Sequence, residues 1–205
     1  MSPRGVPNPA VRQQLFDAAE HVLERDGAQA VSGRAITREA KCATGLLYNH
    51  FEDLEEFLAA LVMDRFRRQT EAWVSLPERA GQGTVAANLV EIAVSLVDSK
   101  AMALAGLVAS RPALASRVGS ALAGGAPGFS ELTDSVTQYL ELERALHRVS
   151  EKSDVQAVSF VLVAAAHQLL LGHSNHAVAG LEPHIARLVR VLMPSLEAEL
   201  STATH

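Results

Sequence analysis

Apolar residues recur along this chain at every third or fourth position, which is the spacing of one face of an α-helix. No stretch of useful length alternates apolar and polar residues with the period of a β-strand. The pattern therefore predicts an all-α fold. The helices we expect cover residues 9–26, 53–76, 84–96, 101–110, 130–147, 153–172 and 182–192, and Pro112 either interrupts a helix or begins a new one.

Residues 32–51 predict two short helices joined by a tight turn. Ser32 can cap the first helix by accepting a hydrogen bond from a backbone N–H of its opening turn. Residues 41–43 form the turn, and Thr44 either caps the second helix or ends the turn before it. Leu47 and Phe51 then lie one turn apart on the inner face. The remaining residues of the second helix are left to solvent or a partner, an arrangement that resembles a DNA-reading helix-turn-helix.

Several residues, taken in order, also resemble the TetR family of one-component transcriptional regulators. Residues 15–19 (Leu-Phe-Asp-Ala-Ala) resemble the first-helix signature of that family, and Leu23 and Gly27 follow it. Ile36 holds the place of an isoleucine in the second helix, and residues 45–51 (G-L-L-Y-N-H-F) are similar to the family's G-T-L-Y-x-H-F run. The resemblance covers roughly the first third of the chain.

The resemblance implies a division of labour along the chain. Residues 1–52 would be a three-helix DNA-binding domain with the helix-turn-helix. Residues 53–205 would be a larger helical domain for effector binding and dimerisation, whose first helix, 53–76, connects the two. A helix of about 20 residues spans about 30 Å, which is long enough for that task.

The resemblance also implies a set of DNA contacts. Tyr48 and His50 would bind backbone phosphates, together with the start of the second helix, and Thr44 would lie near phosphate. An apolar Leu46 can select a base only by contact, most plausibly with a thymine methyl group, and Asn49 could bond a base or a phosphate. The full predicted DNA-binding set is Ser32, Gly33, Arg34, Thr44, Gly45, Leu46, Tyr48, Asn49 and His50.

The chain departs from the family pattern at several positions of this region. Lys41 stands where the family often has glycine, so either a non-glycine residue adopts a positive φ at modest cost or the turn has a different shape. Ala43 and Leu46 replace hydroxyl residues that commonly meet phosphate or base. Leu54 replaces a lysine that often precedes the fourth helix, which removes one backbone cation.

The net charge of −5 argues against a protein that binds nucleic acid over its whole surface. A local footprint is compatible with it, because Arg34, Arg38 and Lys41 outnumber Glu39 in the helix-turn-helix. Cys42 is the single cysteine, so there is no internal disulfide. Its place beside a lysine would suit a redox sensor, but a buried residue filling the turn is the favoured interpretation.

The N-terminal residues show no apolar core typical of a signal peptide. The most apolar run, residues 155–171, is interrupted by polar residues and is shorter than the roughly 20 apolar residues of a membrane span. We therefore expect a soluble, cytoplasmic protein that does not associate with membranes.

The second domain would hold an effector pocket if the resemblance extends that far. Its two last long helices are the expected dimer surface, since two from each subunit would form a four-helix bundle, although burial within one subunit would give the same pattern. Tyr139 and His167 are the better candidates for the pocket, because a buried polar group needs a partner that a ligand can supply. The candidate lining residues are Phe66, Trp73, Met102, Leu107, Tyr139, Leu146, Phe160 and His167.

Metal binding and catalysis have little support in the sequence. His167, His173 and His176 are close together, but they straddle the expected helix end at Gly172 and no cysteine or carboxylate joins them, so we expect no metal site and no cofactor. A helical enzyme is an alternative, yet His21 and His147 are scattered and no serine or cysteine has a nucleophile signature around it.

The favoured hypothesis is a homodimeric repressor that binds a palindromic operator in double-stranded DNA and is released by a small apolar or amphipathic effector. A second alternative is a DNA-binding scaffold that has no effector and acts through protein partners.

Overall fold

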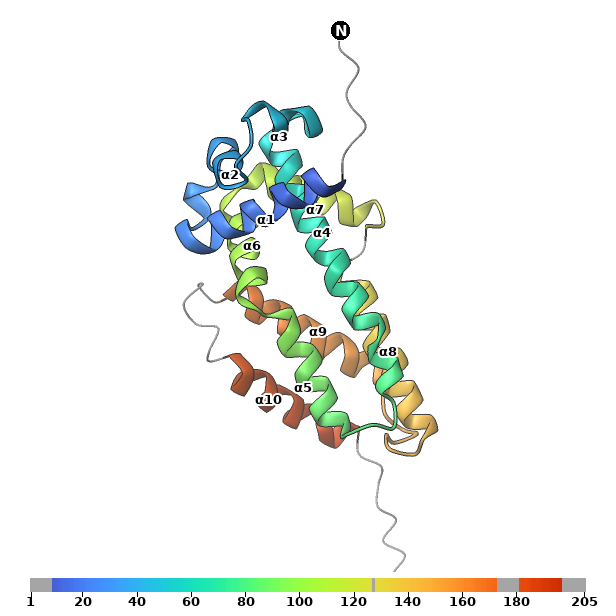
Figure 1. Ribbon diagram of the computed structural model, residues 1–205. Coiled ribbons are helices and arrows are strands. Elements are labelled where there is room, and N and C mark those ends of the chain that lie inside the picture. The colour runs from blue at the N-terminus through green and yellow to red at the C-terminus, as the bar shows by residue number, and fades with distance from the viewer. Residues whose placement is uncertain (1–8, 127, 173–180, 197–205) are drawn as a thin grey trace, which may run out of the picture. The chain divides into compact units, whose positions relative to one another are not determined.

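The computed structural model describes residues 9–126, 128–172 and 181–196, and it contains helices and no β-strand within them (Figure 1). The all-α prediction is confirmed. The helices are α1 (Pro9–Asp26), α2 (Gly33–Glu39), α3 (Gly45–His50), α4 (Leu54–Val74), α5 (Val85–Leu96), α6 (Ser99–Ser110), α7 (Pro112–Ala123), α8 (Phe129–Ala145), α9 (Val155–Gly172) and α10 (Leu181–Leu192).

Two helices begin at residues whose side chains cap the first turn: Ser32, as predicted above, and Thr84, at the start of the helix expected over residues 84–96. The Ser32 hydroxyl accepts a hydrogen bond from the backbone N–H of Ala35 at 3.3 Å, at the start of α2. The Thr84 hydroxyl accepts one from the N–H of Ala87 at 3.1 Å, at the start of α5. Each bond satisfies an N–H that has no partner within the helix, so these boundaries are set locally.

Two other boundaries differ from the expectation or decide between alternatives. Pro112 is the first residue of α7 and so begins a helix rather than interrupting one. Residues 153–156 (Ser-Asp-Val-Gln) predict a capping box that starts at Ser153, but this prediction is wrong by one residue, because Asp154 supplies the cap and accepts a hydrogen bond from the N–H of Ala157 at 2.9 Å. A carboxylate is a stronger acceptor than a hydroxyl for the N–H groups of a helix start.

Contacts divide the chain into two compact units, and the boundary between them along the sequence is not at residue 52. The first comprises Met1–Phe66 with Ser99–Ala126, and the second comprises Arg67–Asp98 with Pro127–His205. Helix α4 therefore runs from one unit into the other, and α6 and α7 belong to the unit of the helix-turn-helix. The division into functions remains a prediction.

The core of the first unit explains why α6 and α7 belong to it. Phe51 and Phe57 lie with ring centroids 5.1 Å apart in an edge-to-face arrangement, and Phe16 lies 5.5 Å from Phe57. Leucines and a valine from α6 and α7 are buried in the same cluster, which closes the core from the side that the first four helices leave open. The buried residues include Leu15, Phe16, Leu23, Ile36, Leu47, Phe57, Leu61, Leu104, Leu107, Leu114 and Val118.

The second unit is built around Trp73 and Tyr139, which are both fully buried. The Trp73 indole N–H donates to the hydroxyl of Ser95 at 3.0 Å, and the Ser135 hydroxyl donates to the Trp73 carbonyl at 2.5 Å. The Asn88 amide donates to the Tyr139 hydroxyl at 2.9 Å. These bonds join α4, α5 and α8 and satisfy the polar atoms that the core encloses.

The apolar run of residues 155–171 predicts a buried helix, and this prediction is wrong for part of α9. Helices α5, α8 and α10 pack against α9, while its residues Phe160 and Val161 are 64% and 42% exposed. Within the described residues no single helix is long and apolar enough to cross a membrane; the neighbouring helices Val85–Leu96 and Lys100–Ser110 reach that standard only when taken as a bent pair.

Candidate DNA-binding surface

The turn between α2 and α3 keeps a positive φ at Lys41, the first of the two alternatives that the sequence left open. Lys41 adopts φ 53°, the left-handed conformation that the missing glycine would have taken more cheaply. The N–H of Cys42 donates to the Thr37 carbonyl at 3.0 Å, which closes the end of α2. The Gln14 side chain of α1 donates to the carbonyl of Ala40 at 2.8 Å. The turn is thus held both by its own backbone and by α1.

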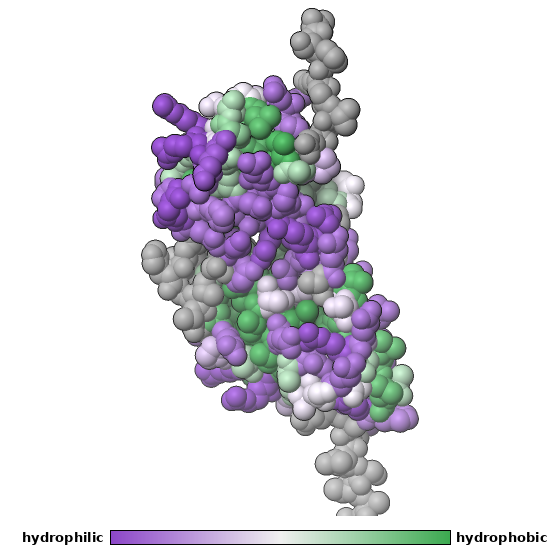
Figure 2. Space-filling model, in the orientation of Figure 1, coloured by the Kyte–Doolittle hydropathy of each residue, from purple (hydrophilic) through white to green (hydrophobic). Residues whose placement is uncertain are grey.

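Helix α3 presents one face to the core and the other outward. Leu47 is fully buried and Phe51, which ends the helix, is 6% exposed. On the opposite side Tyr48 is 50% exposed, Asn49 is exposed and His50 is half-buried. A helix of six residues is not stable alone, so its orientation is fixed by this packing. On the face shown in Figure 2, hydrophilic side chains cover most of the first unit.

Thr44 occupies the position before α3 but does not cap it. Its backbone is already helical, with φ −56° and ψ −35°, and its side chain makes no capping hydrogen bond. A capping residue needs extended backbone to aim its oxygen back at the helix N–H groups. Thr44 therefore ends the turn, the second of the two predicted alternatives, and it lies exposed beside Gly45 and the half-buried Leu46.

The start of α2 lies against Tyr48. Gly33 is buried, and a Cβ added to it would stand 2.7 Å from the Tyr48 hydroxyl oxygen. Glycine is therefore required for the tyrosine to lie in this position. Ser32 and Arg34 on either side are exposed, and the Ser32 oxygen is engaged in capping.

The charge of this surface is more positive than the sequence count suggests. Arg34, Arg38 and Lys41 are all exposed. Glu39, the one carboxylate among residues 32–51, pairs with Arg25 of α1 at 2.9 Å. Neutralising it leaves a local cationic footprint on a chain whose net charge is negative.

Arg12 is a cation of this region that sequence reasoning did not select. It is exposed, and its guanidinium carbon lies 5.1 Å from the Phe16 ring centroid and 5.6 Å from that of Phe51. The two rings hold the charge beside the residue that ends α3. The spacing of four between Arg12 and Phe16 on a predicted helix is the signal that could have identified it.

Comparison with known proteins agrees with this geometry. Residues 15–61 match the family model described as "Bacterial regulatory proteins, tetR family". The chain carries a TetR-family DNA-binding domain. That domain covers most of α1, all of α2 and α3, and the start of α4, so α2 and α3 are its helix-turn-helix. Among curated protein sequences none matches the chain.

Solved structures of TetR-family and related regulators share the fold over nearly the whole chain. A putative TetR-family transcriptional regulator from Mesorhizobium loti matches with a TM-score of 0.71 and 16% identity, covering 92% of this chain and 98% of that one. GusR of Salmonella enterica matches with a TM-score of 0.65 and 17% identity, covering 95% of this chain and 99% of that one. The regulator FadR from Bacillus subtilis, solved in complex with stearoyl-CoA, matches with a TM-score of 0.56 and 18% identity. The match covers 86% of this chain and 96% of that one. At these identities the likeness concerns the fold.

Cys42 in the turn of the TetR-family domain is half-buried and packs partly against the core. Burial raises the pKa of its thiol, since the charged thiolate loses solvation. A raised pKa disfavours the reactive thiolate, and this supports a residue that fills the turn rather than a redox sensor.

The eight candidate effector-lining residues are divided between the two units. Leu146 and Phe160 are 51% and 64% exposed, which is incompatible with walls of an interior pocket of this chain. His167 is half-buried with its ring centroid 4.0 Å from that of Phe129, and burial lowers its pKa. Phe66, Met102 and Leu107 belong to the first unit, and Trp73, Tyr139, Leu146, Phe160 and His167 belong to the second.

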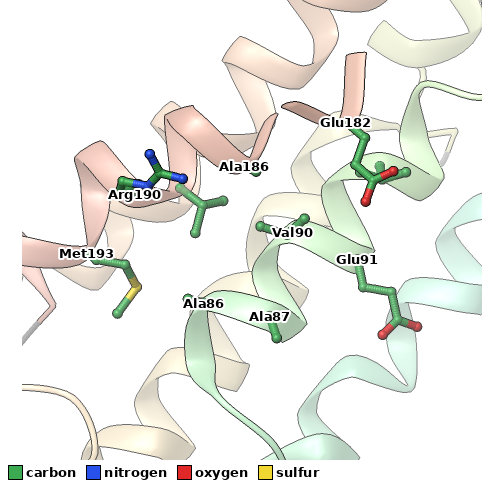
Figure 3. A pocket seen from close by; sticks show the side chains of 10 residues that line it. Ala86, Ala87, Val90, Glu91, Glu182, Ala186, Arg190 and Met193 are labelled. Carbon is green, nitrogen blue, oxygen red and sulfur yellow. The ribbon is translucent and has the colours of Figure 1, made fainter. Parts of the chain in front are cut away.

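A groove of about 590 Å³ lies between α5 and α10 in the second unit (Figure 3). Its floor is formed by small apolar side chains, with Arg190 and Met193 toward one end and Glu91 and Glu182 toward the other. Sequence reasoning selected none of these residues, because alanine and valine on an apolar helix give no sign of whether a partner helix covers them. The lining residues are Ala86, Ala87, Val90, Glu91, Val94, Glu182, Ala186, Val189, Arg190 and Met193.

Metal ligands do not assemble in the described part of the chain. Among those residues no group of three or more histidine, cysteine, aspartate or glutamate side chains could hold an ion. His173 and His176, weighed above as zinc ligands, lie outside the described residues.

Proposed function

We propose that this chain is a ligand-responsive transcriptional regulator, a repressor that binds a palindromic operator as a homodimer and is released by a small apolar or amphipathic effector. The observation that supports it best is the orientation of α3. Leu47 and Phe51 fix the helix from behind, and Tyr48 projects into solvent. A short helix held in this way can enter a major groove without rearrangement.

Contacts to phosphate would position α3, and contacts to bases would give it specificity. Tyr48 and His50 are the proposed phosphate ligands, together with Ser32, Gly33 and Arg34 at the start of α2. For Gly33 the contact would come from its backbone, since it has no side chain and is buried. The residues proposed to meet base edges are Thr44, Gly45 and Leu46, with Asn49 able to bond a base or a phosphate.

The dimer would form through the exposed apolar face of α9. Phe160 and Val161 stand outward with Ala157 and Ala164 at helical spacing, and a second copy would cover them. Val191 of α10 is 69% exposed and would extend the contact into a four-helix bundle. Two-fold symmetry then requires a palindromic operator, with the two copies of α3 about 34 Å apart or a multiple of that spacing.

The functional division we propose is DNA binding by residues 1–52 and effector binding with dimerisation by residues 53–205, with α4 as the connection. One structural relative was solved with stearoyl-CoA, which supports an amphipathic effector class. The groove between α5 and α10 lies within the roughly 300–1,000 Å³ range of small-molecule sites. An effector can shift DNA affinity only by as much as it prefers one conformation over the other.

Selection of duplexes from a random pool with the purified chain tests the proposal. A palindromic consensus would support both DNA reading and two-fold assembly. Selected duplexes without an inverted repeat would overturn the homodimer, and no affinity for any duplex at low salt would overturn the regulator. Operator binding that responds to no amphipathic molecule would favour the scaffold that acts through protein partners.

A further inference from the structure

A cluster of carboxylates follows the reading helix directly. Glu52 and Asp53 immediately precede α4, Glu55 and Glu56 lie in its first turn, and we name these four residues the acidic corner. Asp53 follows His50 by three residues, which places their Cα atoms within about 11 Å of each other. That is close to the screening length of about 10 Å at 0.1 M salt. The negative charges of the acidic corner therefore repel a phosphate bound at His50, because salt does not screen them fully at this distance.

Two arginines from a distant part of the sequence neutralise half of this corner. Arg111, between α6 and α7, binds the Glu55 carboxylate at 2.8 Å, and Arg117 of α7 binds Asp53 at 2.6 Å. Arg111 also donates to the carbonyl of Val31 at 2.7 Å, just before the Ser32 cap. All of these residues lie within the first unit.

A contribution to folding stability is a weak explanation for the ion pair between Arg117 and Asp53. The side chains of Arg117 and Asp53 are 41% and 50% exposed, and exposed ion pairs contribute little to folding. Asp53 already has a structural task, since its carboxylate accepts the N–H of Glu56 at 2.7 Å and caps α4. An acid needed for capping carries a negative charge that DNA binding does not tolerate well, and Arg117 cancels that charge.

We infer that Arg117 and Arg111 are positioning residues for DNA binding, which act by masking the acidic corner from the phosphate backbone. The inference rests on the proposed DNA-binding function. It assigns the two partners of one ion pair opposite effects. Loss of the arginine uncovers a negative charge, whereas loss of the carboxylate leaves a cation beside the DNA.

The test uses the full-length protein, a duplex obtained by the selection above, and four variants. At low salt, Arg117→Ala should weaken binding about twofold per subunit and about fourfold for the dimer, from one unit charge at about 10 Å in water. Asp53→Asn keeps a capping oxygen and should bind as tightly as the parent chain or more tightly. The double variant should return to the parent affinity. Arg79→Ala removes an exposed, paired arginine of the second unit and serves as the matched control.

Salt dependence separates charge masking from a structural role. At about 0.3 M salt the effect of Arg117→Ala should nearly vanish, because screening then acts over a few ångströms. Equal weakening by Arg117→Ala and Asp53→Asn at all salt concentrations would mean that the pair merely holds α7 to α4, and would overturn the inference. An unchanged affinity of Arg117→Ala would overturn it as well. A parent chain that binds no duplex would instead overturn the proposed function.

Discussion

The Tyr48 hydroxyl oxygen lies 2.7 Å from the point where a Cβ on Gly33 would stand. Contacts this short do not occur with a real side chain, so the Tyr48 ring can keep this position only with glycine at 33. The ring of Tyr48 is half exposed and can move, which makes the contact a constraint on the binding surface more than on the core.

Gly33→Ala should therefore displace Tyr48 and weaken operator binding while the protein stays folded. We expect a loss of about tenfold in affinity for each subunit, comparable to one phosphate contact of about 1–1.5 kcal/mol, and so about a hundredfold for the dimer. Fluorescence anisotropy with a labelled duplex measures the affinity, and a melting curve checks the fold. Gly45→Ala is the matched control, since a Cβ there would meet no atom within 4 Å.

Tyr48→Ala should weaken binding to all duplex sequences by about the same factor, because a phosphate contact carries no base information. Leu46→Ala should instead reduce discrimination at one position of the operator, by about 1 kcal/mol for a lost thymine-methyl contact. Binding of each variant to a panel of single-base operator substitutions distinguishes them. A position-specific effect of Tyr48→Ala would contradict its assignment to phosphate.

Arg12→Met should make the negative slope of log affinity against log salt shallower by about 0.9 per subunit, the value for one lost phosphate contact, and so by about 1.8 for the dimer. The methionine keeps the apolar packing on Phe16 and Phe51 and removes the charge. Arg79→Met is the control, because Arg79 is an exposed arginine of the second unit that is paired with Glu91. If both variants keep the parent slope, Arg12 serves the packing of α3 and does not meet phosphate.

Phe160→Glu should produce a monomer with much weaker operator affinity, because a charge on the α9 face cannot be buried against a second copy. Since Phe160 is 64% exposed in the single chain, the variant should fold normally. Sedimentation velocity measures the change of mass. Ser116→Glu adds the same charge at an exposed position of α7, outside α9 and α10, and should remain dimeric.

Alkaline pH should destabilise the second unit through Tyr139. Burial raises the pKa of its hydroxyl to about 12, despite the hydrogen bond from Asn88 that lowers it. The folded state therefore favours the neutral phenol, and this stability is complete below the unfolded pKa of about 10 and is lost as pH rises toward 12. Denaturant melts of the parent chain and of Tyr139→Phe should differ by about 1 kcal/mol at neutral pH. The difference should shrink or reverse between about pH 10 and pH 12.

Local chemistry made the helix-turn-helix predictable. The cap at Ser32, the left-handed Lys41 and the inward pair of Leu47 and Phe51 each depend on residues within about one or two helical turns, which a single sequence displays directly. The exposure of Tyr48 follows from the same spacing.

Long-range pairing could not be predicted in the same way. Arg111 bonds the carbonyl of Val31 across 80 positions of sequence, and nothing local marks either residue for the other. For the same reason the sequence did not show that Leu107 belongs to the core around α1 or that Phe160 stands outside the fold. An apolar helix has the same composition whether its partner is in the same chain, in a second copy or absent.

The core around the reading helix is assembled from two separate stretches of chain, with residues 67–98 between them belonging elsewhere. During synthesis on the ribosome, the first 66 residues emerge without Leu114 and Val118, which complete that core. More than half of the polypeptide must leave the exit tunnel before the domain can close, so nascent chains spend that interval with an incomplete apolar surface that chaperones can bind. A truncated protein that ends after α4 would lack Leu114 and Val118 and could not complete this core.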